Sequence, residues 1–154
     1  LPRDLSPERW LRAHDEVATY AGIREDTLVD VFESLASAAG DSELGYYLGV
    51  PTPGQEWVVG ADLDRLAAHV DYYCLPAYES SRGAVLDAYR TVEAVTPNVP
   101  IHVGVLPGHP AIHDESTVVD IIDGLRAADV PRVSFYNYGL LPERSLSWID
   151  AAIP

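Results

Sequence analysis

The chain has 154 residues, the length of one ordinary domain, and 47% of them are hydrophobic, which is enough for a packed core. Its acidic residues number 24 and its basic residues only 10, all of them Arg, so the formal net charge is −14. A field of that sign repels nucleic acid and anionic membrane surfaces, and we expect neither as a partner.

Two helices are predicted ahead of the first strand. Ser6 and Pro7 provide a cap and a first-turn proline for a helix over Glu8–Tyr20, which Gly22 is expected to end. A second helix is predicted over Glu25–Ala39. Its apolar residues recur at helical spacing: Leu28, Val31, Phe32, Leu35 and Ala39.

Strands and helices then alternate to the end of the chain. The predicted strands are Glu43–Val50, Tyr72–Tyr78, Ile101–Leu106 and Arg132–Tyr138. The predicted helices are Leu63–His69, Ala84–Val95, Ser116–Ala128 and Arg144–Ala152. This rhythm is typical of βαβ units, so we expect one α/β domain over residues 1–154 with parallel strands in sequence order.

Four βα units make half of a (β/α)8 barrel, or the whole of a small open α/β sheet. The open sheet favours a glycine-rich phosphate turn after its first strand, and "GVPTPGQEW" does not have that spacing. The last three predicted strands end in polar or aromatic residues: Tyr78-Glu79, Gly108-His109 and Tyr136-Asn137-Tyr138. Binding sites of (β/α)8 barrels are built from those ends, so the half-barrel is favoured.

Three stretches carry a resemblance to a known group of barrels. "GQEWVVGADLDRLAAHVDYYCLPAYES", "IHVGVLPG" and "VSFYNYGLLP" resemble the C-terminal half of glycoside-hydrolase-like TIM barrels. The resemblance implies a hydrolase acting on carbohydrate, with the predicted strands as the fifth to eighth of the barrel. Its acid/base carboxylate would follow a fourth strand upstream of this chain. The seventh strand, "IHVGVLPGH", ends without the carboxylate that such barrels often carry there.

Glu79 is the candidate catalytic residue, because it matches the position after the sixth strand of such barrels. It would be one of two carboxylates flanking a glycosidic bond, with the phenol of Tyr78 orienting it. The alternative is a solvated acid that favours the positive end of the next helix, which Ser80 and Ser81 open.

The candidate substrate-binding residues are Tyr78, His109, Tyr136, Asn137, Tyr138 and Trp57. Phenols and amides suit polyhydroxylated ligands because they provide donors and acceptors, and the Trp57 ring beside Glu56 suits stacking on a sugar. Alternation puts Tyr136 and Tyr138 on one face and Asn137 on the other, unless the strand end frays. The alternatives are packing at the barrel top for the two Tyr and a partly buried anchor for Trp57.

Metal, disulfide and cofactor chemistry have little support in the sequence. His109, His113 and Asp114 lie in one loop without metal-ligand spacing, so no metal or cofactor is expected. His102 is expected to point either into the barrel interior or into the helical layer, most simply as a core imidazole. Cys74 is the single cysteine, which excludes an internal disulfide, and it reads as a small buried hydrophobe.

Partners and location follow from the same features. The outer strands of a half-barrel lack partners on one side, so we expect an upstream half-barrel or a second chain to cover them. Dispersed acids without Lys suggest adaptation to high salt, with a GC-rich genome as the alternative. The chain has no Met and shows no leader or apolar run of about 20 residues, which favours a cytoplasmic piece of a longer protein.

Two classes of function fit these observations. The first is a glycoside-hydrolase-like enzyme. The second is a non-catalytic barrel that binds a sugar or serves as a scaffold because its acid pair is missing, since one barrel fold hosts many functions.

Overall fold

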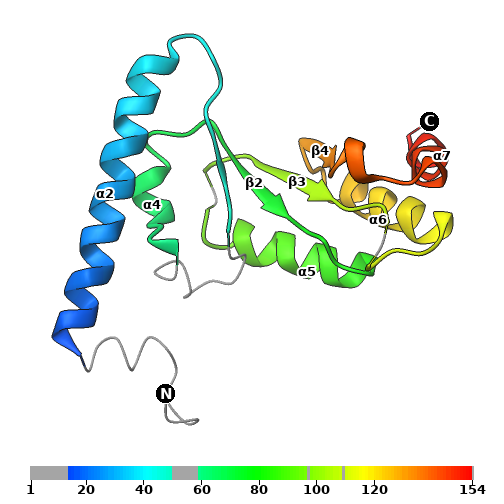
Figure 1. Ribbon diagram of the computed structural model, residues 1–154, viewed down its shortest axis with the longest axis horizontal. Coiled ribbons are helices and arrows are strands. Elements are labelled where there is room, and N and C mark those ends of the chain that lie inside the picture. Colours follow the sequence, from blue (N-terminus) through cyan, green and yellow to red (C-terminus); the bar gives the residue numbers. More distant parts are fainter. Residues whose placement is uncertain (1–13, 50–58, 97, 109, 154) are drawn as a thin grey trace.

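The computed structural model describes residues 14–49, 59–96, 98–108 and 110–153. Its centre is a four-stranded parallel sheet whose strands lie side by side in sequence order (Figure 1). The strands are β1 (Gly45–Tyr47), β2 (Tyr72–Pro76), β3 (Ile101–Val105) and β4 (Arg132–Phe135). The α/β class and the parallel order are confirmed, and each strand is shorter than its predicted run.

A helix precedes the sheet and further helices follow the strands. They are α2 (Asp15–Ala39), α4 (Leu63–Leu66), α5 (Arg82–Glu93), α6 (Glu115–Ala127), the 3-10 turn η1 (Tyr138–Leu140) and α7 (Glu143–Ala152). Side-chain caps start three of the α-helices, because the oxygens of Asp62, Ser81 and Asp114 accept hydrogen bonds from backbone N–H groups in the first turn. Pro142 occupies the N-cap of α7, which begins at Glu143, one residue before its predicted start at Arg144.

The two helices predicted before β1 are one continuous helix, α2. Gly22 lies inside it, so the prediction that Gly22 ends a helix is wrong. A glycine inside a helix costs only about 1 kcal/mol relative to alanine, and α2 offsets this by burying Ala21, Val29 and Phe32. The Phe32 ring packs edge-on against Tyr46, with 5.3 Å between ring centroids. Residues 8–13 of the first predicted helix lie outside the described residues.

One face of the sheet packs against the helices and forms the core. Tyr73 and Leu75 of β2, and Val103 and Val105 of β3, have no exposed surface. In Figure 1, helix α5 lies along strands β2 and β3. Helix α6 packs against α5 and against α7. Helix packing therefore explains why every second residue of these strands is aliphatic or aromatic.

The opposite face, which we call the open face, carries the residues that alternate with the core. Register places Tyr47 beside Cys74, Cys74 beside His102, and His102 beside Arg132, so these side chains form one row across all four strands. Paired residues of neighbouring strands project from the same face.

None of the described helices combines the length and the apolar character needed to cross a membrane.

Candidate functional site

Three tyrosines from three strands meet at the carboxyl end of the open face. Tyr47 is the last residue of β1, Tyr78 follows β2 and Tyr136 follows β4 directly. The Tyr47 and Tyr78 hydroxyl oxygens lie 2.8 Å apart in a hydrogen bond. The rings of Tyr78 and Tyr136 stack, with centroids 5.3 Å apart and planes at 24°. We call these residues the tyrosine cluster.

A glycine in β3 leaves space for this cluster. Tyr78 and Tyr136 come from strands that are not neighbours, and β3 lies between them. A Cβ atom at Gly104 would lie 3.8 Å from the Tyr78 ring and 3.7 Å from the Ser134 hydroxyl. A longer side chain at Gly104 would therefore occupy the space over β3 across which Tyr78 reaches Tyr136.

The cluster combines a half-buried centre with two accessible flanks. Tyr47 keeps 52% and Tyr136 49% of their surface exposed, whereas Tyr78 is half-buried between them. Burial, followed by the hydrogen bond with Tyr47, raises the pKa of the Tyr78 phenol far above its usual value. Tyr78 therefore stays protonated at neutral pH and keeps both donor and acceptor capacity.

Glu79 directly follows Tyr78 of the cluster in sequence, and its side chain does not cap a helix. Ser81 is the capping residue of α5, and the first turn of that helix contains no acid. Glu79 is exposed and, within the described part of the chain, has no hydrogen bond or ion pair. Its carboxylate is therefore exposed to solvent, one residue after Tyr78 of the cluster.

The chain changes conformation immediately after Tyr136. The Tyr136 N–H still donates to the Val105 carbonyl at 2.9 Å, which extends the ladder by one bond. The next peptide bond, between Tyr136 and Asn137, is cis. The Asn137 side-chain oxygen accepts from the Leu140 N–H at 3.1 Å and caps η1. The strand thus ends before Asn137, and the side-chain oxygen of this residue accepts from the backbone three residues further on.

The described part of the chain does not place the other predicted binding residues at the cluster. Trp57 and His109 lie outside the described residues. The backbone of Tyr138 starts η1, and its side chain also lies outside the description. The structure thus brings together two of the predicted binding residues, Tyr78 and Tyr136, and leaves the others as predictions.

Tyr47 was missed by the sequence reasoning. The run "ELGYYLGV" reads as a uniformly buried strand, but Tyr46 packs on Phe32 while Tyr47 faces the opposite way and is exposed. The available signal was position, because Tyr47 lies near the carboxyl end of its predicted strand, as Tyr78 and Tyr136 do in theirs.

A second group of polar side chains occupies the amino end of the open face. The rings of Tyr72 and His102 stack with centroids 4.1 Å apart, and Arg132 lies 3.4 Å from the Glu43 carboxylate. Tyr72 lies directly over Gly45, where any Cβ atom would collide with its ring. His102 is thus half-buried on the open face and does not point into the helical layer.

The charge on His102 is disfavoured by its surroundings. Loss of hydration by burial, and then the nearby Arg132 guanidinium, lower the pKa of the imidazole, while the Glu43 carboxylate opposes them. Cys74, in the same row, is half-buried and has a raised thiol pKa because of burial. Both groups are therefore uncharged at neutral pH.

Among the described residues, no group of three His, Cys, Asp or Glu side chains is placed to hold a metal ion. Asp114 instead caps α6, accepting from the Thr117 N–H at 2.9 Å and from the Ser116 hydroxyl at 2.6 Å. These bonds lower the pKa of the Asp114 carboxyl.

Comparisons with known proteins do not identify a relative of this chain. No protein-family model, curated protein or solved structure matches the chain. The resemblance to glycoside-hydrolase-like barrels therefore stays a prediction from short motifs.

Proposed function

We propose that the open face binds a carbohydrate or another polyhydroxylated small molecule at the tyrosine cluster. The observation that carries this proposal is the convergence of Tyr47, Tyr78 and Tyr136 from three strands at the carboxyl edge of one parallel sheet. Ligand sites of parallel α/β folds lie at that edge.

The chemistry of the cluster suits such a ligand. The half-exposed ring of Tyr136 offers an apolar face against which the C–H groups of a sugar ring can pack. The hydroxyls of Tyr47 and Tyr78 are already aligned with each other, and each phenol both donates and accepts. The site therefore provides stacking and hydrogen bonds with no charged group in the cluster itself.

The fold that we propose around the site is half of a (β/α)8 barrel. Within the described residues β1 and β4 each pair with one neighbour only, and the open face would become the interior of a closed barrel. The outward side of α2 also exposes apolar residues, including Tyr20, Ile23 and Val31. An upstream half-barrel or a second chain would cover these edges.

Binding can be tested with a panel of neutral oligosaccharides, such as cello-, malto-, xylo- and chito-hexaose, measured by calorimetry. Tyr136→Ala should weaken binding roughly 3- to 10-fold, because an aromatic contact contributes about 0.5–1.5 kcal/mol. Tyr20→Ala is a matched control, since Tyr20 is an exposed tyrosine on α2. Equal losses in the two variants, or no binding of any member of the panel, would count against the proposal.

Hydrolysis is the second candidate function, and the position of Glu79 favours it. Glu79 is exposed, is not used to cap α5 and directly follows Tyr78. A glycosidase needs a second carboxylate about 5–9.5 Å away, which we expect to come from the upstream half. Glu79→Gln in the complete protein should reduce turnover by orders of magnitude while sugar binding and the melting temperature stay nearly unchanged. Unaltered turnover would remove Glu79 from the mechanism.

A further inference from the structure

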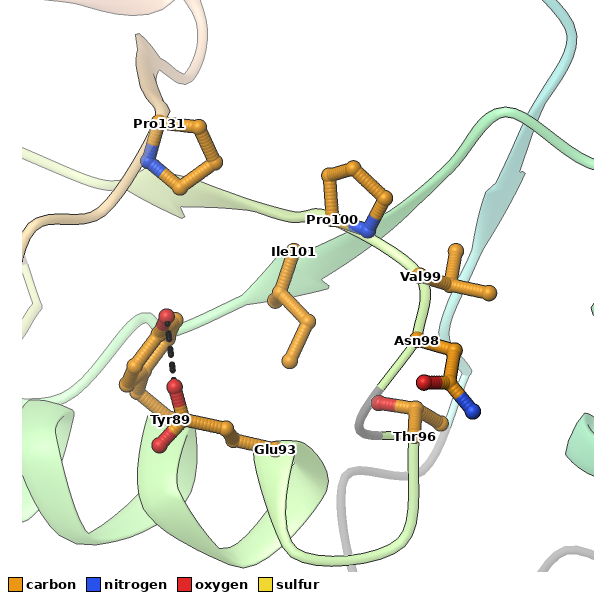
Figure 2. A pocket seen from close by; sticks show the side chains of 8 residues that line it. All are labelled: Tyr89, Glu93, Thr96, Asn98, Val99, Pro100, Ile101 and Pro131. Carbon is orange, nitrogen blue, oxygen red and sulfur yellow. Dashed lines mark hydrogen bonds between the residues drawn. The ribbon is translucent and has the colours of Figure 1, made fainter.

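A pocket of about 300 Å³ lies at the opposite, amino end of the sheet (Figure 2). It is bounded by the C-terminal half of α5 and by the segments that lead into β3 and β4. Val99, Pro100, Ile101 and Pro131 form its apolar walls. Small-molecule pockets start at roughly this volume, so the space is sufficient for a small organic ligand.

Two residues of α5 place polar atoms in this pocket. Tyr89 is 6% exposed, and its hydroxyl donates to Glu93 Oε1 at 3.1 Å, as Figure 2 shows. Glu93 itself is exposed and has no cationic partner among the described residues. The nearest arginine in sequence, Arg90, pairs with Asp87 on the preceding turn instead. The Glu93 carboxylate thus keeps one oxygen uncommitted.

The local field in the pocket is negative. Burial, the hydrogen bond to Glu93, and the charges of Glu93 and Asp129 together raise the pKa of the Tyr89 phenol. The C-terminal end of α5 adds its partial negative charge at the same place. An anion would be repelled here, and a neutral apolar ligand would leave the Glu93 carboxylate without a partner.

We propose that this pocket binds a small organic cation, in which an ammonium or guanidinium group pairs with Glu93 and a short apolar stem lies against Val99, Ile101 and Pro131. The site is independent of the tyrosine cluster, because it occupies the other end of the strands. Its ligand is either a free amine or the side chain of a lysine or arginine in a partner.

Nuclear magnetic resonance titration of the whole chain tests this site at fixed, low ionic strength. The probes are butylammonium, its neutral analogue butanol, and N-acetyl-arginine amide. We expect butylammonium or the blocked arginine to shift the Val99 and Ile101 methyl signals, with butanol at least about tenfold weaker, because a charge-assisted hydrogen bond is roughly twice as strong as a neutral one. Preference for butylammonium assigns an ammonium ligand, from a free amine or a lysine side chain, and preference for the blocked arginine assigns a guanidinium ligand.

Two variants separate the site from general electrostatics. Glu93→Gln should weaken binding of the cation about tenfold while the remaining methyl spectrum stays native. Asp150→Asn removes an equal charge from an exposed position of α7 that does not line the pocket, and binding should be unchanged. The proposal is overturned if neither cation shifts these methyl signals, if butanol binds as well as butylammonium, or if both variants lose affinity equally.

Discussion

On the helix-covered face of the sheet, Leu75 and Val103 are fully buried, whereas on the open face of the same sheet Tyr47 and Tyr136 are half exposed. Parallel sheets normally have both faces covered and carry aliphatic residues on both. The open face instead carries phenols, an imidazole and a guanidinium. The helix-covered face therefore contributes the buried apolar surface that stabilises the fold, whereas the open face leaves polar groups accessible.

The largest contrast should come from neighbouring residues of β2 that point to opposite faces. Leu75→Ala leaves a cavity under the helices, and we expect the free energy of unfolding to fall by about 2–5 kcal/mol. Cys74→Ala changes a half-buried side chain on the open face, and its cost should be about 1 kcal/mol or less. Denaturant unfolding of the two variants measures both values. Equal losses would show that the open face is also part of the core.

A smaller effect should appear with pH at His102. Because its folded-state pKa lies below the ordinary value of about 6.5, protonation favours the unfolded chain. The contribution of His102 to stability is therefore fully present above about pH 6.5 and declines as the pH falls from there through the folded-state pKa.

Melting curves of the protein and of His102→Gln between pH 5 and 7.5 isolate this contribution. The difference between their melting temperatures should change in that window. Arg132→Gln removes a charge that opposes protonation, so the His102 pKa, followed by nuclear magnetic resonance, should rise. A His102 pKa at or above that of a free imidazole would contradict the described surroundings.

The strand order could be predicted from the sequence because short apolar runs alternate with helical segments, and this alternation is typical of parallel βαβ units. In a continuous apolar run, the sequence does not show which of two neighbouring residues points to the core and which to the opposite face. Tyr46 and Tyr47 are such a pair. Gly22 misled for a related reason, since tertiary packing of Val29 and Phe32 overrides a weak local preference.

The candidate site was only partly predictable. Tyr78 and Tyr136 lie at strand ends, and the rule that parallel strands share a carboxyl edge brings them together. Their stacking depends on the small Gly104 in the strand between them, which no local pattern reveals. The role of Asn137 depends on where β4 ends, and strand ends are poorly determined by sequence.

The proposed function requires that the tyrosine cluster, and not the buried tyrosines, contacts the ligand. Labelling all nine tyrosines with 3-fluorotyrosine, and assigning each signal by a Tyr→Phe variant, makes every ring observable by ¹⁹F resonance. On titration with the oligosaccharide that binds best, we expect the Tyr47, Tyr78 and Tyr136 signals to shift and those of the buried Tyr73 and Tyr89 to stay in place. Binding that leaves the three cluster signals unchanged would contradict the account.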